Sequence, residues 1–536
     1  MADNYEQYSK DELLRLLRER DRKPRFGLVW ERDEIEHDKS LNDDFVALDL
    51  DADLSCGDAP FENLIIEGDN FDALRYLRMT HAGQVKCIYI DPPYNTGNRD
   101  FIYNDRFVDK DDTYRHSKWL EFMYRRLVLA KDLLAEDGVI FVSIGEDEFF
   151  RLASLMDQIF VGMPRVGTFI WKTRHSADSR NQTGCSIDHE YVFCYGQKIR
   201  GTFIDETKFS NPDNDHRGAW RSADMTGLAT KEQRPNLHYD LTNPESGSVY
   251  SCPPKGWRYE PKSMRKLLAE HRVLWPADPS GRPRLKKFLG ELTTNFKGFS
   301  SLLDVPLTSD GTKELNSVDL GQGFPFPKPT GMIQALIEQA TQPGDLVLDF
   351  FAGSGTTAHA VMKLNAEDGG KRRFILVSST EATGDAPDKN LCRDVCAERV
   401  RRVAQGYTNK NGEAVDGLGG GFAYLRTKRI PISRVFNDIQ HEQVWRALQL
   451  IHRTPLSAYD EGVLVQLAGD GDDRLVYAPK LSEAVLDELS RLAELGGRLV
   501  VYSWQPGQIR QRVEAANVAF ERIPEFLVSR FGGMAR

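Results

Sequence analysis

The sequence lacks long apolar runs, and it contains few cysteines for its 536 residues. No uncharged stretch approaches the ~20 apolar residues that a membrane helix needs, and the charged N-terminus has no apolar signal-peptide core. The seven cysteines are scattered and odd in number, which is typical of a reducing compartment without a disulfide framework. These absences exclude secreted and membrane proteins, so we expect a cytoplasmic protein.

Two kinds of cofactor site are also missing from the pattern. Cys392 and Cys396 lie four residues apart in a predicted helix, but no CxxC pair or histidine cluster supplies further ligands for zinc. The chain has no G-x-x-x-x-G-K-[ST] loop, which P-loop ATPases require. We therefore predict no resident metal and no ATPase activity in this chain.

An excess of positive charge is absent as well, since the formal net charge is −10. This balance argues against a general nucleic-acid coat protein, but residues 251–300 hold eleven Lys or Arg against four Asp or Glu. Aromatic residues such as Trp257 and Trp275 are interleaved with them. Concentrated basic charge is the electrostatic footprint of phosphate binding. A solvated basic face with its aromatics turned into the core explains the same pattern.

Short β-rich apolar runs alternate with segments of helical periodicity. This alternation predicts an α/β fold with a mostly parallel, doubly wound sheet, which binds ligands at the carboxyl ends of its strands. The predicted strands are Leu64–Ile66, Cys87–Ile90, Val139–Ile144, Phe169–Trp171, Tyr191–Tyr195, Leu346–Phe350 and Phe374–Ser378.

The alternation is interrupted by an irregular stretch rich in Asn, Asp, Pro, Gly and Ser, and this interruption sets the domain boundaries. We expect an inserted domain there, between two halves of one α/β domain. A charged, partly helical segment precedes these halves, and a C-terminal α/β module follows the glycine-rich run GLGGGF. The expected segments are 1–60, 61–165, 166–322 for the insertion, 323–420, and 421–536 for the module.

The first chemical motif is Asp91-Pro92-Pro93-Tyr94, directly after the apolar stretch VKCIYI. An acid at the carboxyl end of a buried strand faces the ligand crevice. The prolines lack N–H donors and leave carbonyl oxygens free to accept hydrogen bonds, and Tyr94 offers a flat ring. A carboxylate, a carbonyl and an aromatic ring together suit a nucleobase held by its exocyclic amino group. A simple proline turn, with the acid capping the next element, is the alternative.

The second motif, DFFAGSGTT from Asp349 to Thr357, also follows a buried strand and opens a predicted helix. Gly353 and Gly355 permit a tight turn and the close approach of a ligand. The run also fits the G-x-G-x-x-A pattern of dinucleotide sites, and Glu381 ends a strand where ribose hydroxyls are bound in such folds. This motif alone does not separate NAD from S-adenosylmethionine.

Together the motifs resemble those of amino-directed DNA methyltransferases, which carry F-x-G-x-G and [DNS]-P-P-[YFW]. The catalytic motif comes first here, which is the circularly permuted order of the β class. Further stretches are similar to the Mod subunits of type III restriction–modification systems, among them YSKDELLRLLRERDRKPRFGLVWE (8–31), HEYVFCYG (189–196), FPFPKPTGMI (324–333) and RDVCAERVRRV (393–403). The resemblance implies a Rossmann-like S-adenosylmethionine-dependent fold with an inserted target-recognition domain.

This resemblance implies methyl transfer to the N6 amino group of adenine. Asp91 and the carbonyl of Pro92 would accept from that amino group, with Pro93 completing the turn. Tyr94 would stack on the base once it is flipped from the duplex. An in-line transfer then requires positioning more than acid–base chemistry. Asp at the first position is similar to adenine-specific members, since cytosine-N4 enzymes usually carry Ser; cytosine-N4 transfer stays an alternative.

The resemblance also implies a set of cofactor contacts and a set of DNA contacts. Asp69 and the Lys328–Thr330 segment have a second interpretation as helix caps. The expected contacts with S-adenosylmethionine are Asp69, Lys328, Thr330, Asp349, Phe351, Gly353, Gly355, Thr356 and Glu381. The expected DNA contacts are Asn95 in the base pocket, where a turn-forming role is the alternative, and Lys255, Arg258, Arg282, Arg284, Lys286 and Lys287 in the insertion.

The implied partners are double-stranded DNA, a second copy of the chain, and a restriction subunit carrying the ATPase and nuclease. Two other functions compete. An NAD-dependent oxidoreductase explains the glycine pattern but not the Asp91-Pro92-Pro93-Tyr94 motif. A DNA-recognition subunit with an inactive site requires that both motifs persisted without use.

Overall fold

The structure is a computed structural model. It describes residues 9–10, 12, 28–32, 35, 37–38, 41–97, 101–103, 106–179, 184–278, 280–294, 296–383, 386–469, 472–513 and 515–533. The predicted N-terminal helix lies almost wholly outside them. The chain divides into two compact units: unit 1 comprises residues 1–199 and 300–536, and unit 2 comprises residues 200–299.

A ten-stranded sheet forms the centre of unit 1, in the order β1-β21-β2-β18-β17-β3-β6-β8-β7-β16. Neighbouring strands from β21 to β6 run parallel, whereas β1 is antiparallel to β21 and β8 is antiparallel to β6 and β7. The strands are β1 (Phe45–Cys56), β2 (Leu64–Glu67), β3 (Val85–Ile90), β6 (Leu134–Ile144), β7 (Arg165–Lys172), β8 (His189–Gly196), β16 (Leu302–Leu303), β17 (Leu346–Asp349), β18 (Arg373–Ser378) and β21 (Phe422–Ile430).

The direction in which successive strands are added to this sheet reverses between β17 and β3, although the two strands themselves are parallel. Strands β18 and β2 extend the sheet beyond β17, and β6 and β8 extend it beyond β3. Because Val347 pairs with Cys87 and Leu348 with Ile88 in parallel register, the carboxyl ends of β17 and β3 lie side by side. Open α/β sheets bind their ligands at such a switch point.

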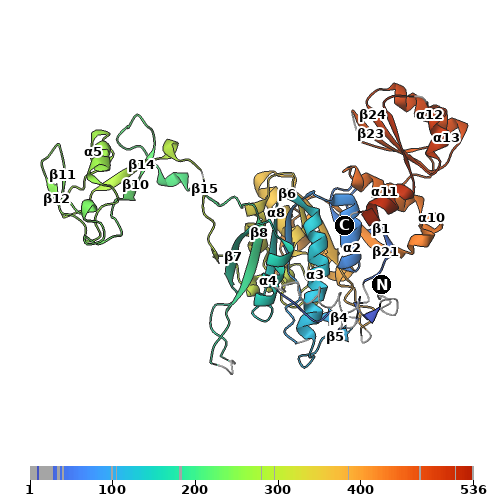
Figure 1. The fold of residues 1–536 in the computed structure, drawn as a ribbon, viewed down its shortest axis with the longest axis horizontal. Helices are drawn as coiled ribbons and strands as arrows, with labels where there is room; N and C mark the ends of the chain where they lie inside the picture. The colour runs from blue at the N-terminus through green and yellow to red at the C-terminus, as the bar shows by residue number, and fades with distance from the viewer. Residues whose placement is uncertain are drawn as a thin grey trace. The chain divides into compact units, whose positions relative to one another are not determined.

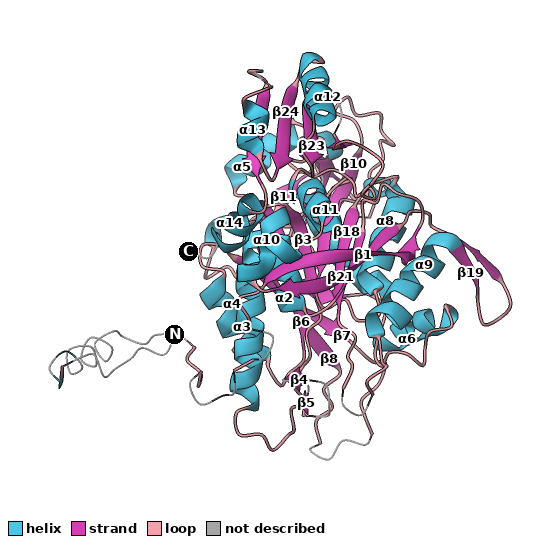
Figure 2. Ribbon diagram, turned by 90° about the vertical axis from the view of Figure 1, so that its right-hand side faces the viewer, coloured by secondary structure: helices cyan, strands magenta, loops and turns pink. Residues whose placement is uncertain are grey.

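Helices cover both faces of the sheet. In Figure 2, α3 and α4 lie to one side of the strands and α8 and α9 to the other. The central strands are consequently buried on both faces and read as continuous apolar runs, as in VKCIYI of β3. This confirms the predicted doubly wound α/β sheet. The principal helices are α2 (Asn70–His81), α3 (Arg115–Leu133), α4 (Phe149–Ile159), α6 (Thr308–Ser317), α7 (Thr330–Ala340), α8 (Thr356–Asp368) and α9 (Glu398–Gln405), which continues a π-helical turn at Cys392–Ala397.

All seven predicted strands are present, but the N-terminal segment differs from expectation. The stretch FVALDLDADLSC lies in the segment that was expected to be charged and partly helical, and it forms the edge strand β1 instead. Its first residues, from Phe45 to Leu48, are buried. Two of its acids have partners: Asp49 accepts from the Gln443 side chain at 2.6 Å, and Asp51 pairs with Arg426 of the neighbouring β21.

The C-terminal part of unit 1 contains a second sheet, in the order β22-β23-β24-β25. It has its own apolar core around Val476, Leu489 and Val501. The expected module boundary at residue 421 moves, because β21 joins the main sheet beside β2. The elements are α10 (Val435–Asp438), α11 (His441–Ile451), β22 (Gln466–Ala468), β23 (Asp473–Ala478), α12 (Glu483–Glu494), β24 (Arg498–Ser503), α13 (Pro506–Arg510), β25 (Val518–Arg522) and α14 (Glu525–Gly533).

Unit 2 is narrower than the expected insertion at 166–322. Strands β7, β8 and β16 belong to unit 1 because they pair within its sheet, and α6 belongs to it because Glu314 contacts Thr330 of α7 and Arg399 of α9. Unit 2 itself (green in Figure 1) has a small core around Trp257 and Met264. Its elements are β9 (Thr202–Phe203), β10 (Trp220–Asp224), β11 (Leu241–Thr242), β12 (Val249–Tyr250), α5 (Pro261–Ala269), β13 (Val273–Leu274), β14 (Arg284–Phe288) and β15 (Phe296–Lys297).

Short hairpins complete unit 1. Strand β4 (Ile102–Tyr103) pairs with β5 (Arg106–Phe107), and β19 (Gly406–Thr408) pairs with β20 (Ala414–Asp416). Among the described residues, no helix has both the length and the apolar character needed to cross a membrane. The same part of the chain contains no group of three or more His, Cys, Asp or Glu placed to hold a metal ion.

Candidate active site at the switch point

The Asp91 carboxylate lies just beyond the carboxyl end of β3, where one cation engages both of its oxygens. The Lys328 ammonium donates to Oδ1 at 2.9 Å and to Oδ2 at 2.7 Å. The Tyr94 hydroxyl lies 3.0 Å from Oδ1 of Asp91 and 2.8 Å from Oε2 of Glu190. Two carboxylates therefore share one ammonium and one phenol at this position.

The turn that carries the motif is fixed by α3 and β6. The indole N–H of Trp119 donates to the Pro93 carbonyl at 2.7 Å. Among the described residues, no protein group donates to the Pro92 carbonyl, so this oxygen keeps its accepting capacity. Gly145 follows β6, and a Cβ there would lie 2.9 Å from the Tyr94 ring. A side chain at position 145 would therefore displace the ring.

Lys328, which was expected to contact the cofactor, lies at the Asp91 turn. Its ammonium pairs with Asp91 and lies 3.4 Å from Glu190. The ammonium also lies 5.0 Å from the ring centroid of Tyr94 and 5.9 Å from that of Trp171. Burial lowers the pKa of Lys328, but Asp91 and Glu190 outweigh burial, so this pKa is raised and the side chain is a cation.

The glycine-rich loop turns away from β17 beside this cluster. Asp349, the last residue of β17, accepts from the Thr357 hydroxyl at 2.5 Å and from the Phe351 amide at 2.9 Å. Gly353 and Gly355 have φ values of 49° and 74°, a left-handed conformation that favours glycine. A Cβ on Gly355 would also lie 2.9 Å from the Cys396 carbonyl. Both glycines are thus required by backbone shape.

Asp69 has the helix-cap role that was its alternative interpretation. Its carboxylate accepts from the Phe71 amide at 2.7 Å at the start of α2, and it lies 3.3 Å from the Arg126 guanidinium. It nevertheless remains 36% exposed, so the carboxylate can also meet a ligand. The adjacent Asn70 donates to the Phe350 carbonyl at 2.9 Å, which ties this helix start to the glycine-rich loop.

Thr330 and Thr356 lie behind the loops rather than on their surface. Both are buried, and both hydroxyls accept from the Arg399 guanidinium, at 3.2 Å and 2.7 Å. Arg399 is itself fully buried and lies 3.5 Å from Glu314 of α6. Burial lowers the pKa of Arg399 to about 10, which leaves it charged. Arg399 was not predicted from the sequence, and it joins the starts of α7 and α8.

Glu381 follows β18 in a left-handed conformation with φ of 51°. Its carboxylate pairs with the exposed Lys389 at 2.7 Å. It is 35% exposed, so a ribose hydroxyl has access to it. Phe351 lies with its ring centroid 5.9 Å from that of Phe122, and the two rings provide apolar surface beside the same loop.

The predicted DNA-contacting residues separate into two groups. Five of them are exposed in unit 2, namely Lys255, Arg258, Arg282, Arg284 and Lys287. Lys286 is buried and pairs with Asp213 and Asp215. Asn95 is also fully buried, and its amide donates to Glu148 at 2.6 Å and to the Arg115 carbonyl at 3.2 Å. Lys286 and Asn95 therefore have structural roles in the isolated chain.

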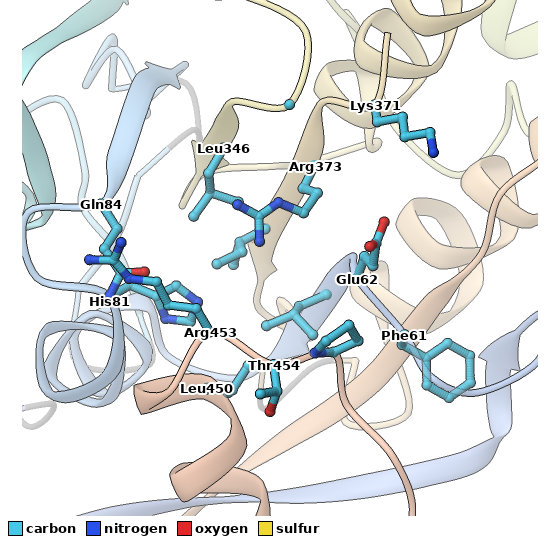
Figure 3. A pocket seen from close by; sticks show the side chains of 14 residues that line it. Phe61, Glu62, His81, Gln84, Leu346, Lys371, Arg373, Leu450, Arg453 and Thr454 are labelled. Carbon is cyan, nitrogen blue, oxygen red and sulfur yellow. The ribbon is translucent and has the colours of Figure 1, made fainter. Parts of the chain in front are cut away.

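A cavity of about 320 Å³ lies at the amino ends of the central strands, on the side of the sheet opposite to the Asp91 turn (Figure 3). It is lined by Leu346 and Arg373, the first residues of β17 and β18. Arg453 lies beside His81 there (Figure 3). Burial, together with these two arginines, lowers the pKa of His81 to about 3, so the imidazole is neutral. Because this cavity lies at the amino ends of the strands, it is separate from the Asp91 turn and the glycine-rich loop.

The strand order and the two loops at its switch point define a Rossmann-like α/β methyltransferase domain. A model of the DNA methylase family matches residues 85–382, which is more than half of the chain. The chain belongs to this DNA methylase family.

Curated relatives include Mod subunits of type III restriction–modification enzymes. The StyLTI Mod subunit of Salmonella typhimurium strain LT2 is 33% identical over 67% of this chain and 59% of its own length. The EcoP15I Mod subunit of Escherichia coli is 30% identical over 64% of this chain and 63% of its own length. The chain thus spans about three fifths of the length of these relatives.

Solved structures overlap with the chain less closely. The complex of M1.HpyAVI with SAM is 14% identical and covers 59% of this chain and 93% of its own, with a TM-score of 0.28. The fold assignment rests on the strand order of the chain itself.

Proposed function

We propose that the chain is an S-adenosylmethionine-dependent DNA methyltransferase that acts on the N6 amino group of adenine in double-stranded DNA. One observation carries the proposal. An acidic Asp-Pro-Pro-Tyr turn and a glycine-rich loop meet at the switch point of a parallel sheet, although they lie more than 250 positions apart in the sequence. Such an arrangement brings a nucleobase amino group next to a bound methyl donor.

The residues of the turn hold the amino nitrogen. Asp91 accepts one of its hydrogens and the Pro92 carbonyl accepts the other, which directs the nitrogen lone pair towards the glycine-rich loop. Tyr94 stacks on a base that has left the duplex. Trp119 fixes the turn through the Pro93 carbonyl, so the acceptor positions are set before the base arrives. Positioning accelerates the attack itself, and the methylated nitrogen then loses one of its hydrogens as a proton, for which the hydrogen-bonded Asp91 carboxylate is the proposed acceptor.

The residues around the glycine-rich loop fit S-adenosylmethionine. The loop backbone can approach a ligand closely at Gly353, whose φ is 49°. Three acidic side chains, those of Asp69, Asp349 and Glu381, lie at or shortly after the carboxyl ends of the strands β2, β17 and β18. They suit a ligand with a sulfonium, an ammonium and ribose hydroxyls. Phe351 supplies apolar surface. When bound, the cofactor supplies the electrophilic methyl group.

Unit 2 is the proposed target-recognition domain. Its exposed lysines and arginines would contact phosphates, which position the protein on the duplex without reading its sequence. By analogy with the Mod subunits, a homodimer and a restriction subunit are the proposed protein partners. The low mean hydropathy of −0.48 and the absence of a membrane-spanning helix among the described residues support a cytoplasmic location.

The test is methylation by the purified chain alone. The protein is incubated with S-adenosylmethionine and unmethylated genomic DNA, and modified bases are mapped by single-molecule sequencing. We expect N6-methyladenine at one short motif. Asp91→Ala should lower the rate by about a hundredfold or more, as expected for removal of a preorganised polar contact, whereas Asp345→Asn at the far end of β17 should not. N4-methylcytosine would overturn the base assignment, and no modification would overturn the activity.

A further inference from the structure

The Lys328 ammonium occupies the position that the proposed mechanism gives to the amino group of the target base. Its distances to the two Asp91 oxygens, 2.9 Å and 2.7 Å, are those of charge-assisted hydrogen bonds. The same nitrogen lies 5.0 Å from the Tyr94 ring centroid, within the range of a cation–π contact. The ammonium therefore competes with an arriving amino group for the Asp91 carboxylate.

A second anchor for the ammonium is already in place. Glu190, the second residue of β8, has its Oε2 atom 3.4 Å from the ammonium. The Tyr94 hydroxyl, 2.8 Å from the same oxygen, holds the Glu190 carboxylate in position. The ammonium also lies 5.9 Å from the ring centroid of the buried Trp171. Lys328 can therefore leave Asp91 without entering water or losing its counter-charge.

We propose that Lys328 is a positioning residue for the target base, in an extension of the proposed function. The ammonium holds Asp91 before the target base binds and moves onto Glu190 when the base amino group arrives. From there it donates a hydrogen bond to the ring nitrogen next to the amino-bearing carbon.

This assignment gives the pocket a chemical preference. Adenine N1 and cytosine N3 are unprotonated acceptors beside an exocyclic amino group, so each can receive a hydrogen bond from an ammonium. Guanine presents a mixed edge, because its amino-bearing carbon lies between N1, which carries a hydrogen, and N3, which is an acceptor. A donor left without a partner in a buried site costs its full desolvation. Lys328 therefore favours a base whose unprotonated ring nitrogen faces it, as in adenine and cytosine, while other features separate adenine from cytosine.

The experiment is a double-mutant cycle between Lys328 and adenine N1. Wild type and Lys328→Met are compared on duplexes of the mapped recognition sequence that carry adenine or 1-deazaadenine at the target. Methylation rates are measured, together with duplex affinity in the presence of S-adenosylhomocysteine. 7-Deazaadenine, which keeps N1, is the control base. Lys313→Met is the control protein, because Lys313 pairs with Asp310 on the exposed side of α6.

We expect 1-deazaadenine to lower the wild-type rate and affinity by about tenfold, the value of one hydrogen bond to a charged group. Lys328→Met should be slower on adenine and show no further loss with 1-deazaadenine. Glu190→Gln should weaken the same coupling, and it keeps the test valid if Lys328→Met does not fold. Equal losses in wild type and both variants would overturn the inference. Absence of wild-type methylation would instead refute the proposed function and, with it, this assignment.

Discussion

Asp349 is the group whose charge we expect to change when the cofactor binds. It is 2% exposed at the end of β17. Burial raises the pKa of this carboxyl to about 7, and the nearby Asp91 carboxylate adds to the shift, although the Thr357 hydroxyl and Phe351 amide oppose it. A sulfonium or ammonium bound beside Asp349 would favour its ionised form. Cofactor binding should therefore release a proton from Asp349.

The size of this release follows from the pKa of about 7. Asp349 is then about half protonated at pH 7 and about nine-tenths protonated at pH 6, so binding should release about 0.5 and 0.9 protons. The apparent affinity for S-adenosylmethionine should fall by about fivefold from pH 7 to pH 6, approach tenfold per pH unit at lower pH, and level off above pH 8. Since the pKa of Asp349 is higher in the folded chain than in the unfolded one, its protonation also stabilises the fold below pH ~4, and this contribution is lost as pH rises through 7.

Titration calorimetry in buffers of different ionisation enthalpy measures the protons released. Asp349→Asn should remove the release at pH 6 and flatten the affinity profile. Asp345→Asn should behave as wild type, since Asp345 precedes the same strand and accepts from the Gln342 amide at 2.7 Å. Because the cofactor's own ionisation is common to all three proteins, the differences report Asp349 alone. A wild-type chain that releases no more protons at pH 6 than Asp349→Asn would refute the reasoning.

Three further predictions concern the loop frame and unit 2. Arg399→Met should destabilise unit 1 by about 3 kcal/mol and weaken cofactor binding, because it removes the buried cation that pairs with the half-buried Glu314 and donates to the buried Thr330 and Thr356 hydroxyls; thermal unfolding and calorimetry measure both. Gly355→Ala should cost ~1–3 kcal/mol through backbone strain, seen as a lower unfolding temperature. The double variant Lys255→Gln/Lys287→Gln should reduce the slope of log DNA affinity against log salt concentration by about 2 if each lysine contacts one phosphate. Lys286→Gln should not change that slope. Fluorescence anisotropy at several salt concentrations measures it.

The sequence predicts which strand ends and loops form the site better than it predicts which side chains contact one another there. Apolar runs followed by Asp91 and Asp349 are visible as patterns, because buried parallel strands leave that pattern. The position of Lys328 against Asp91 is not visible, since it depends on strand order and on a loop 237 residues away. Arg399 gives no local signal either, because a buried arginine in a helical run reads like a surface one. The sequence of unit 2 shows its charge but not that Lys286 is used internally.

The path of the chain around β8 explains how a large insertion leaves the site intact. Strand β8 places Glu190 beside Lys328 and ends at Gly196, shortly before unit 2 begins. The chain returns at β16, which pairs with β7, the strand next to β8. Both ends of the insertion are therefore attached to strands on the same side of the main sheet, so the length of unit 2 does not alter the strand order of that sheet. Strand β8 carries Glu190 and strand β7 carries Trp171. The proposed base pocket is therefore built on β8, from which unit 2 emerges, and on β7, with which the returning strand β16 pairs.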